Sequence, residues 1–128
     1  MNFLLIDDDV EELEIFGIAE ADGGMSHSWD QALSSGKGVH TLLTNFPAAV
    51  FIDFNMPGIS GIECAKRIRL IPGHTTTCLI LYSTSMSDEM RLQAAITGID
   101  FCFQKPASIP EVNELISFIS NHLLQRGH

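Results

Sequence analysis

The sequence predicts an α/β fold in which helices cover both faces of a doubly wound, five-stranded parallel sheet. Short apolar runs without polar alternation occur at residues 3–6, 49–52 and 78–82, and such runs are typical of strands that are buried on both faces of a parallel sheet. A segment with apolar residues at helical spacing follows each run, which indicates parallel strands joined by crossover helices. The first two runs end directly in carboxylates, and ligands bind at the carboxyl edge of such sheets.

The first strand–helix unit is expected at the N-terminus. Residues 3–6 form its strand, and its helix runs from Val10 to about Glu20 with Asp9 as the N-cap, because a carboxylate accepts the unpaired N–H groups of a first turn. The residues at helical spacing in this helix are Val10, Leu13, Phe16 and Ile18.

The second unit is the least clearly marked. A short edge strand is expected near residues 26–30, where Trp29 is interpreted as a packing residue. Ser34-Ser35-Gly36 predicts the cap of a helix that ends near Asn45. An alternative begins this helix near Asp30 and breaks it at residues 36–38, since glycine weakens a helix.

Three further units complete the sheet. Their strands are expected at residues 49–53, 78–82 and 101–103, and their helices at 61–71, from a Ser87 cap to Gly98, and from a Ser108 cap onward. The inner stripe of the helix at 61–71 is expected to contain Ile62, Ala65, Ile68 and Leu70. The apolar positions of the next helix include Met90, Leu92, Ala95 and Ile96, and the inward positions of the last are Val112, Leu115, Ile116, Ile119 and Leu123.

Length and composition limit the possible functions. The chain has 128 residues and a formal net charge of −9, so we expect one domain spanning residues 1–128, without an output domain and without direct nucleic-acid binding, which requires clustered Lys and Arg. The sequence shows neither a signal peptide nor an apolar run long enough for a membrane span. A cytoplasmic protein without a membrane partner is therefore expected.

Cysteine and histidine residues show no metal-binding spacing. Cys64, Cys78 and Cys102 are odd in number and lack a C-x-x-C pair, which favours buried free thiols over disulfides or a zinc site. The five histidines are expected at the surface or in loops. They are His27, His40, His74, His122 and His128.

Reactive side chains follow four of the expected strands. Because parallel strands end at one edge, these side chains are expected to meet in one crevice. They are Asp7 and Asp8 after the first strand, Asp53 after the third, Ser83 after the fourth and Lys105 after the fifth. Three carboxylates in one crevice repel one another, and a hard divalent cation such as Mg²⁺ removes that repulsion.

The same residues suggest phosphoryl chemistry. Asp8, Asp53 and the backbone carbonyl of Asn55 are candidate Mg²⁺ ligands, and Asp7 is a candidate to hold a metal-bound water. The second oxygen of Asp53 is then a candidate nucleophile, since carboxylates form acyl phosphates. Lys105 is expected to bind a phosphoryl oxygen, and Ser83 to donate a hydrogen bond to another.

The motifs resemble the receiver domain of two-component response regulators over essentially the whole chain. Those motifs are D-D-D after an apolar strand, D-x-N-M-P-G-x-S-G, a serine ending the fourth strand, and K-P after the fifth. The resemblance implies a flavodoxin-like sheet with strand order 2-1-3-4-5. It also implies Mg²⁺, Asp53 as the phosphoacceptor, and a histidine kinase or phosphotransfer protein as the donor. A downstream protein partner would read a conformational change, so the chain is expected not to be an enzyme.

Two details of the resemblance bear on how the signal leaves the site. The family implies a cis peptide between Lys105 and Pro106, which only an X–Pro bond makes accessible. The family usually has an aromatic residue three positions before the lysine, where this chain has Cys102. We therefore expect the output to depend on Ser83 and the loop after it, with Cys102 passive.

Other functions stay open at this point. Within the family, a phosphorelay shuttle or phosphate sink competes with a partner-regulating switch. A phosphotransferase or phosphatase resembling the haloacid dehalogenases would use an aspartyl intermediate, but it needs an acid at position 55, where this chain has asparagine. A flavodoxin-type cofactor binder needs a phosphate-binding loop after the first strand, where Asp7-Asp8-Asp9 would repel phosphate. Turnover of a phosphomonoester, or colour in the purified protein, would favour one of these two.

Overall fold

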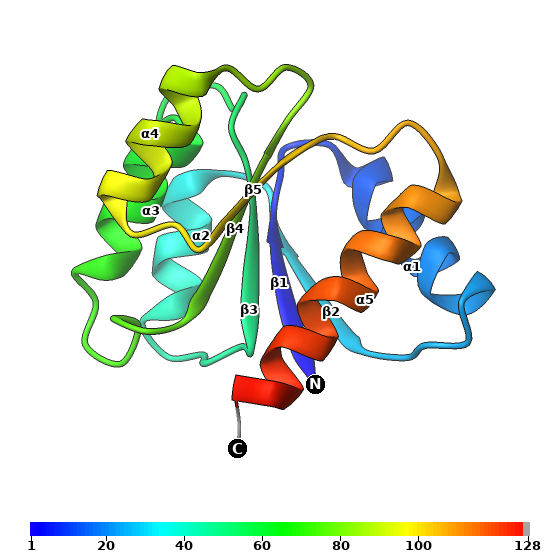
Figure 1. Ribbon diagram of the computed structural model, residues 1–128. Coiled ribbons are helices and arrows are strands. Elements are labelled where there is room, and N and C mark those ends of the chain that lie inside the picture. The colour runs from blue at the N-terminus through cyan, green and yellow to red at the C-terminus, as the bar shows by residue number, and fades with distance from the viewer. Residues whose placement is uncertain (127–128) are drawn as a thin grey trace.

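Five parallel strands form one sheet at the centre of the computed structural model, which describes residues 1–126 (Figure 1). The strands are β1 (Asn2–Ile6), β2 (Ser28–Ala32), β3 (Ala49–Asp53), β4 (Cys78–Ser83) and β5 (Phe101–Gln104). The helices are α1 (Val10–Asp22), α2 (Ser35–Leu42), α3 (Gly61–Arg69), α4 (Asp88–Thr97) and α5 (Ile109–Arg126). The strand order is β2-β1-β3-β4-β5 with every pair parallel. The predicted fold class and strand order are therefore confirmed.

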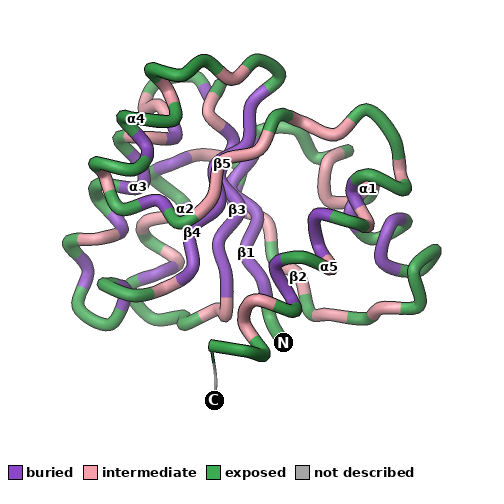
Figure 2. The backbone as a smooth tube through the Cα atoms, in the orientation of Figure 1, coloured by how far each residue is buried: buried purple, intermediate pink, exposed green. Residues whose placement is uncertain are grey.

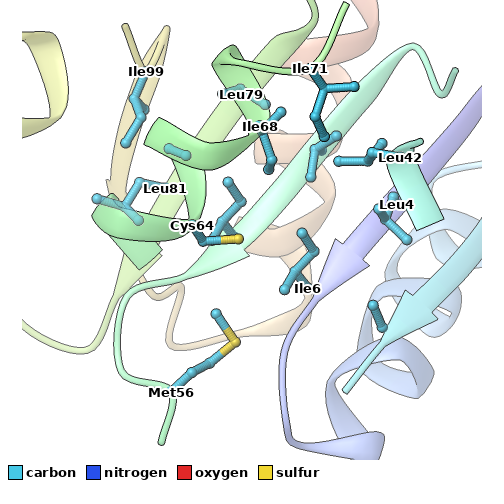
Figure 3. Close-up of a cluster of buried hydrophobic side chains, with 14 of the residues drawn as sticks. Leu4, Ile6, Leu42, Met56, Cys64, Ile68, Ile71, Leu79, Leu81 and Ile99 are labelled. Carbon is cyan, nitrogen blue, oxygen red and sulfur yellow. The ribbon is translucent and has the colours of Figure 1, made fainter. Parts of the chain in front are cut away.

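The helices form one layer on each side of the sheet. Figure 1 shows α1 and α5 on one face and α2, α3 and α4 on the other. Successive side chains of a strand point to opposite faces, so Leu4 and Ile6 contribute to the cluster under α2, α3 and α4, which Figure 3 shows. Phe3 and Leu5 contribute to the cluster under α1 and α5. The central strands are buried along their length (Figure 2), which explains their uninterrupted apolar runs.

The helix caps follow the predicted polar residues. The Asp9 carboxylate accepts from the Glu11 N–H at 2.9 Å, the Ser34 hydroxyl from the Lys37 N–H at 3.1 Å and the Ser87 hydroxyl from the Met90 N–H at 3.1 Å. Each bond satisfies a backbone donor that the first turn leaves without a partner. Among the described residues, no helix is both long and apolar enough to cross a membrane.

Some predicted boundaries were wrong by a few residues. β2 lies two residues later than expected, at Ser28–Ala32, because its pairing with β1 aligns Asn2 with Ser28. α2 begins after Ser34, so the alternative start near Asp30 was also wrong. α3 ends at Arg69 rather than Ile71.

Several apolar residues at helical spacing face solvent instead of the core. Leu92 and Ile96 of α4 are 59% and 70% exposed, because α4 contacts the core through the small side chain of Ala94. Leu70, which was expected on the inner stripe of α3, lies beyond the end of that helix and is exposed. Val10 and Ile18 are exposed as well, and α1 packs through Phe16 and Ala19. Two further residues were expected to point inward and are only partly buried, namely Ile62 and Leu123.

His74 lies in a loop, which is one of the two places predicted for the histidines, but it is not at the surface. Its side chain is fully buried, and its Nε2 donates to the carbonyl oxygens of Leu42 at 2.7 Å and Asn45 at 3.1 Å. Its Nδ1 lies 2.8 Å from the Thr77 hydroxyl oxygen. Carbonyl oxygens only accept, so Nε2 carries the ring proton. The ring thus joins the end of α2 to the loop before β4.

His27 is also mostly buried, because it belongs to a polar cluster at the far end of α1. Its Nδ1 lies 2.5 Å from a carboxylate oxygen of Glu20, and the indole N–H of Trp29 donates to the other oxygen. Trp29 packs against Phe3 and Phe16, so its predicted packing role is confirmed. His40 is exposed and His122 is partly buried, whereas His128 lies outside the described residues.

Replacement of His74 by alanine is expected to destabilise the fold by about 2–3 kcal/mol, because two buried carbonyl oxygens lose their donor. Urea denaturation at neutral pH measures this loss. His40→Ala, on the exposed side of α2, is the matched control and should change the free energy of unfolding by less than about 0.5 kcal/mol. Equal effects of the two substitutions would contradict a bonding role for His74.

Candidate functional site

Three carboxylates meet where β1 and β3 end at the same edge of the sheet. One carboxylate oxygen from each of Asp7, Asp8 and Asp53 lies within 4.8 Å of the others. Asp7 and Asp53 are 0% and 3% exposed, while Asp8 is exposed. The sequence predicts this convergence because parallel strands end at one edge of a sheet, and the structure shows that β1 and β3 are parallel neighbours. The site is therefore acidic, with two of its carboxylates shielded from water and one open to it.

Asp53 is held between a backbone donor and a lysine. Its Oδ1 accepts from the Asn55 N–H at 3.1 Å, and its Oδ2 lies 3.6 Å from the Lys105 Nζ. The chain then turns closely over the strand end, because a Cβ at Gly61 would lie 2.7 Å from the Asp53 carbonyl oxygen. Only glycine fits this approach of α3 to the end of β3.

The carboxylate of Asp53 lies in an environment that disfavours its charge. Burial raises the pKa of Asp53, and the nearby carboxylates of Asp7 and Asp8 raise it further. The Asn55 N–H and the Lys105 ammonium oppose this shift. A cation placed among the three carboxylates would favour the ionised form of all of them.

Glu12 is a fourth acid near the site that the sequence reasoning did not select. Burial raises the pKa of this half-buried residue, Lys105 opposes the shift, and Asp7, Asp9 and Asp53 add to it. Its position in the first turn of α1, soon after Asp7-Asp8-Asp9, was the available signal.

Ser83 and Lys105 lie on neighbouring strand ends and are joined through the backbone. The Lys105 N–H donates to the Ser83 carbonyl oxygen at 2.7 Å. The buried hydroxyl of Ser83 accepts from the Asn55 side-chain amide at 3.2 Å. Asn55 therefore contacts Asp53 with its backbone and Ser83 with its side chain. All five side chains that were predicted to meet come from this one edge of the sheet.

The expected cis peptide between Lys105 and Pro106 was wrong, since residues 1–126 contain no cis peptide bond. The trans isomer is the lower-energy form of an X–Pro bond. The Lys105 N–H reaches the Ser83 carbonyl, and the Lys105 ammonium reaches Asp53, with that bond trans.

Tyr82 is the second residue near the site that sequence reasoning missed, because it was counted only as part of an apolar strand. Its hydroxyl donates to Asp7 Oδ2 at 2.5 Å, and the centroid of its ring lies 5.4 Å from the Lys105 Nζ. Burial and the negative charge of Asp7 raise the pKa of Tyr82, so the phenol keeps its proton and acts as a donor. The pairing of Tyr82 with Asp53 across β3 and β4 follows only once the strand register is known.

Comparison with known proteins identifies the family. The family model "Response regulator receiver domain" matches residues 3–117. The chain belongs to the response regulator receiver domain family. Receiver domains of two-component systems are signalling domains rather than conventional enzymes, and the resemblance noted from the sequence motifs is thereby confirmed.

Curated relatives match part or most of this chain. "Stress response regulator protein 1" of Lodderomyces elongisporus is 31% identical over 119 residues, which are 93% of this chain and 32% of the relative. "Virulence sensor protein BvgS" of Bordetella pertussis is 39% identical over 75 residues, which are 53% of this chain and 6% of the relative. This receiver domain thus spans about a third or less of these relatives.

Solved structures share the fold. A two-component response regulator from Clostridium difficile superposes with a TM-score of 0.82 at 20% identity, covering 100% of this chain and 98% of that one. The chemotaxis protein CheY4 of Vibrio cholerae superposes with a TM-score of 0.80 at 18% identity, covering 92% and 97%. At this level of identity the likeness concerns the architecture.

Cys102 occupies the β5 position where the family usually has an aromatic residue. It is half-buried, and it packs against the cluster under α2, α3 and α4. Phe101 and Phe103 point to the other face, where both rings contact Phe118 of α5. The aromatic side chains of β5 therefore cannot substitute for the missing one. The other two cysteines, Cys64 and Cys78, are buried free thiols as predicted.

Replacement of Asp53 by asparagine is expected to stabilise the metal-free protein at neutral pH. An acid whose pKa is raised by folding costs stability when it is ionised, and this cost disappears as the pH falls below its pKa in the unfolded chain. The gain should be on the order of 1 kcal/mol, the size of a partly screened repulsion between neighbouring charges. It should shrink as the pH is lowered towards 4.

Thermal unfolding in EDTA at several pH values tests this expectation. Asp30→Asn, at an exposed position of β2, is the matched control for loss of one carboxylate and should have little effect. A destabilised Asp53→Asn protein at neutral pH would contradict the electrostatic account of the site.

Proposed function

We propose that Asp53 accepts a phosphoryl group from a phosphohistidine of a histidine kinase or phosphotransfer protein, with Mg²⁺ as the cofactor. The observation that best supports this proposal is the cluster of Asp7, Asp8 and Asp53 beside Lys105 at one edge of the sheet. Membership of the receiver family supports the same reading.

The donor set suits a hard cation. Asp8, Asp53 and the Asn55 backbone carbonyl would hold Mg²⁺ directly, and Asp7 would hold one of its waters. When bound, Mg²⁺ neutralises the negative charge that gathers as the phosphoryl group is transferred. Because Asp8 is exposed, this side of the site is open to solvent and to an incoming donor.

The chain's own residues perform the transfer. An Asp53 carboxylate oxygen attacks the phosphorus, the new O–P bond forms as the N–P bond of the donor breaks, and the electron pair of that bond stays on the imidazole nitrogen. The Lys105 ammonium, 3.6 Å from Asp53 Oδ2, binds a phosphoryl oxygen and stabilises its charge. The hydroxyl of Ser83 donates to another phosphoryl oxygen.

The signal then leaves through the segment that contains Ser83. Phosphorylation replaces one negative charge by about two and adds acceptor oxygens, which biases Ser83 and the loop after it toward the site. We propose that this movement changes the surface formed by α4, β5 and α5, and that a protein partner binds this surface in a cytoplasmic pathway. Cys102 is a passive filler in this account.

A relay role is the second candidate within the same chemistry. The similarity to part of a protein named as a virulence sensor favours the relay role. In that match, this receiver-family chain aligns with a protein that is named as a sensor and not as a response regulator. In that role Asp53 would pass its phosphoryl group onward to a histidine. An aspartyl phosphatase is less well supported, since Asn55 stands where such enzymes need their second acid.

Acetyl phosphate with Mg²⁺ is expected to form one hydroxylamine-labile phosphoryl adduct per chain, mapped to Asp53 by mass spectrometry of intact protein and peptides. Asp53→Asn should abolish the adduct, because it removes the nucleophilic oxygen, while Asp30→Asn should not. The proposal would be contradicted if Asp53→Asn gave the same adduct yield as the wild type, or if the wild type gave no adduct.

A further inference from the structure

Tyr82 holds one of the three carboxylates of the site. This residue is the only tyrosine of the chain, and its side chain is 1% exposed. Its hydroxyl donates to Asp7 Oδ2 at 2.5 Å, while Asp7 Oδ1 accepts from the Asp9 N–H at 2.9 Å. Each oxygen of the Asp7 carboxylate therefore has a fixed donor, and together the two donors set the plane of the group.

The same ring lies beside the cation of the site. The Lys105 Nζ is 5.4 Å from the Tyr82 ring centroid, within the range of a cation–π contact. The Tyr82 ring packs in the core, where its centroid lies 6.2 Å from the centroid of the Phe16 ring. Tyr82 is thus a rigid element that contacts both Asp7 and Lys105, which lie at the ends of different strands.

We propose that Tyr82 is a positioning residue that holds Asp7 through its hydroxyl and Lys105 through its ring. This inference rests on the proposed function, because it assigns Tyr82 a role in cation binding and phosphoryl transfer. Groups that hydrogen-bond to the residues around a metal orient those residues, and their loss typically lowers metal affinity 10- to 100-fold. The hydroxyl should affect Mg²⁺ binding through Asp7, and the ring should affect phosphoryl transfer through Lys105.

Two substitutions separate these steps. Tyr82→Phe removes the hydroxyl and keeps the ring, so it should raise the Mg²⁺ dissociation constant about 10-fold. The rate of labelling by acetyl phosphate at saturating Mg²⁺ should fall less in Tyr82→Phe than in Tyr82→Leu, because the ring beside Lys105 is kept. Tyr82→Leu also removes the aromatic face from Lys105, so it should weaken Mg²⁺ binding and, in addition, slow labelling at saturating Mg²⁺ at least threefold.

Phe16→Leu is the matched control. It alters the packing against the Tyr82 ring without removing either contact with the site. A general loosening of the core would weaken Mg²⁺ binding in this variant as well. The proposal predicts an unchanged Mg²⁺ dissociation constant for it.

The wild-type protein supplies a measurement that does not depend on any variant. Tyrosine labelled with ¹³C at the ring carbon that bears the hydroxyl should give one NMR signal, because there is one tyrosine. Titration with Mg²⁺ should shift this signal with the same midpoint that calorimetry gives for Mg²⁺ binding, since the phenol is bonded to Asp7. A signal that stays still while Mg²⁺ binds would overturn the proposal.

The outcomes also separate this inference from the proposed function. If the wild type binds Mg²⁺ and is labelled at Asp53, but Tyr82→Phe binds Mg²⁺ with the same affinity, the role of Tyr82 is overturned and the proposed function stands. Wild type that neither binds Mg²⁺ nor is labelled overturns both. A weakened affinity in Tyr82→Phe with an unchanged affinity in Phe16→Leu supports the positioning role.

Discussion

Mutual repulsion among Asp7, Asp8 and Asp53 is the constraint on which the site depends. Their oxygens lie within 4.8 Å of one another, and two of the three side chains are buried. Hydrogen-bond donors offset part of the free-energy cost of this repulsion. Asp7 accepts from the Tyr82 hydroxyl and the Asp9 N–H, and Asp53 accepts from the Asn55 N–H. These donors and Lys105 leave the net charge of the site negative, which suits a divalent cation.

The sheet makes such crowding possible because its central strands are rigid. β3 and β4 are buried from end to end, and β1 is buried from Phe3 to Ile6, so the residues at their carboxyl ends cannot move apart without disturbing both clusters of the core. Gly61 lets α3 begin directly over the end of β3. Rigid strand ends hold the carboxylates in fixed positions, which suits the proposed cation binding and phosphoryl transfer.

The sequence predicted the features that follow from local patterns. Apolar runs located β1, β3 and β4, and parallel connection was enough to bring Asp7, Asp53 and Lys105 to one edge. The sequence did not predict contacts between side chains of distant segments, because such contacts depend on where each side chain points. Tyr82 lies 75 residues from Asp7, on a strand that does not pair with β1, and only the three-dimensional arrangement of the side chains shows that its hydroxyl reaches that carboxylate.

Polar residues inside the fold were missed for a related reason. His74 and Glu20 are buried because partners from other elements satisfy them, and a list of residue types carries no record of those partners. The opposite error, at Leu92 and Ile96, arose because helical spacing shows that a face is apolar without showing what covers it.

Mg²⁺-dependent thermal stability tests the central claim most directly. If the three carboxylates gather around a cation, Mg²⁺ at 100 times its dissociation constant should stabilise the wild type by about 2.7 kcal/mol. Asp8→Asn should lose most of that gain. Stabilisation no greater than that produced by NaCl at the same ionic strength, in wild type as in Asp8→Asn, would contradict the account.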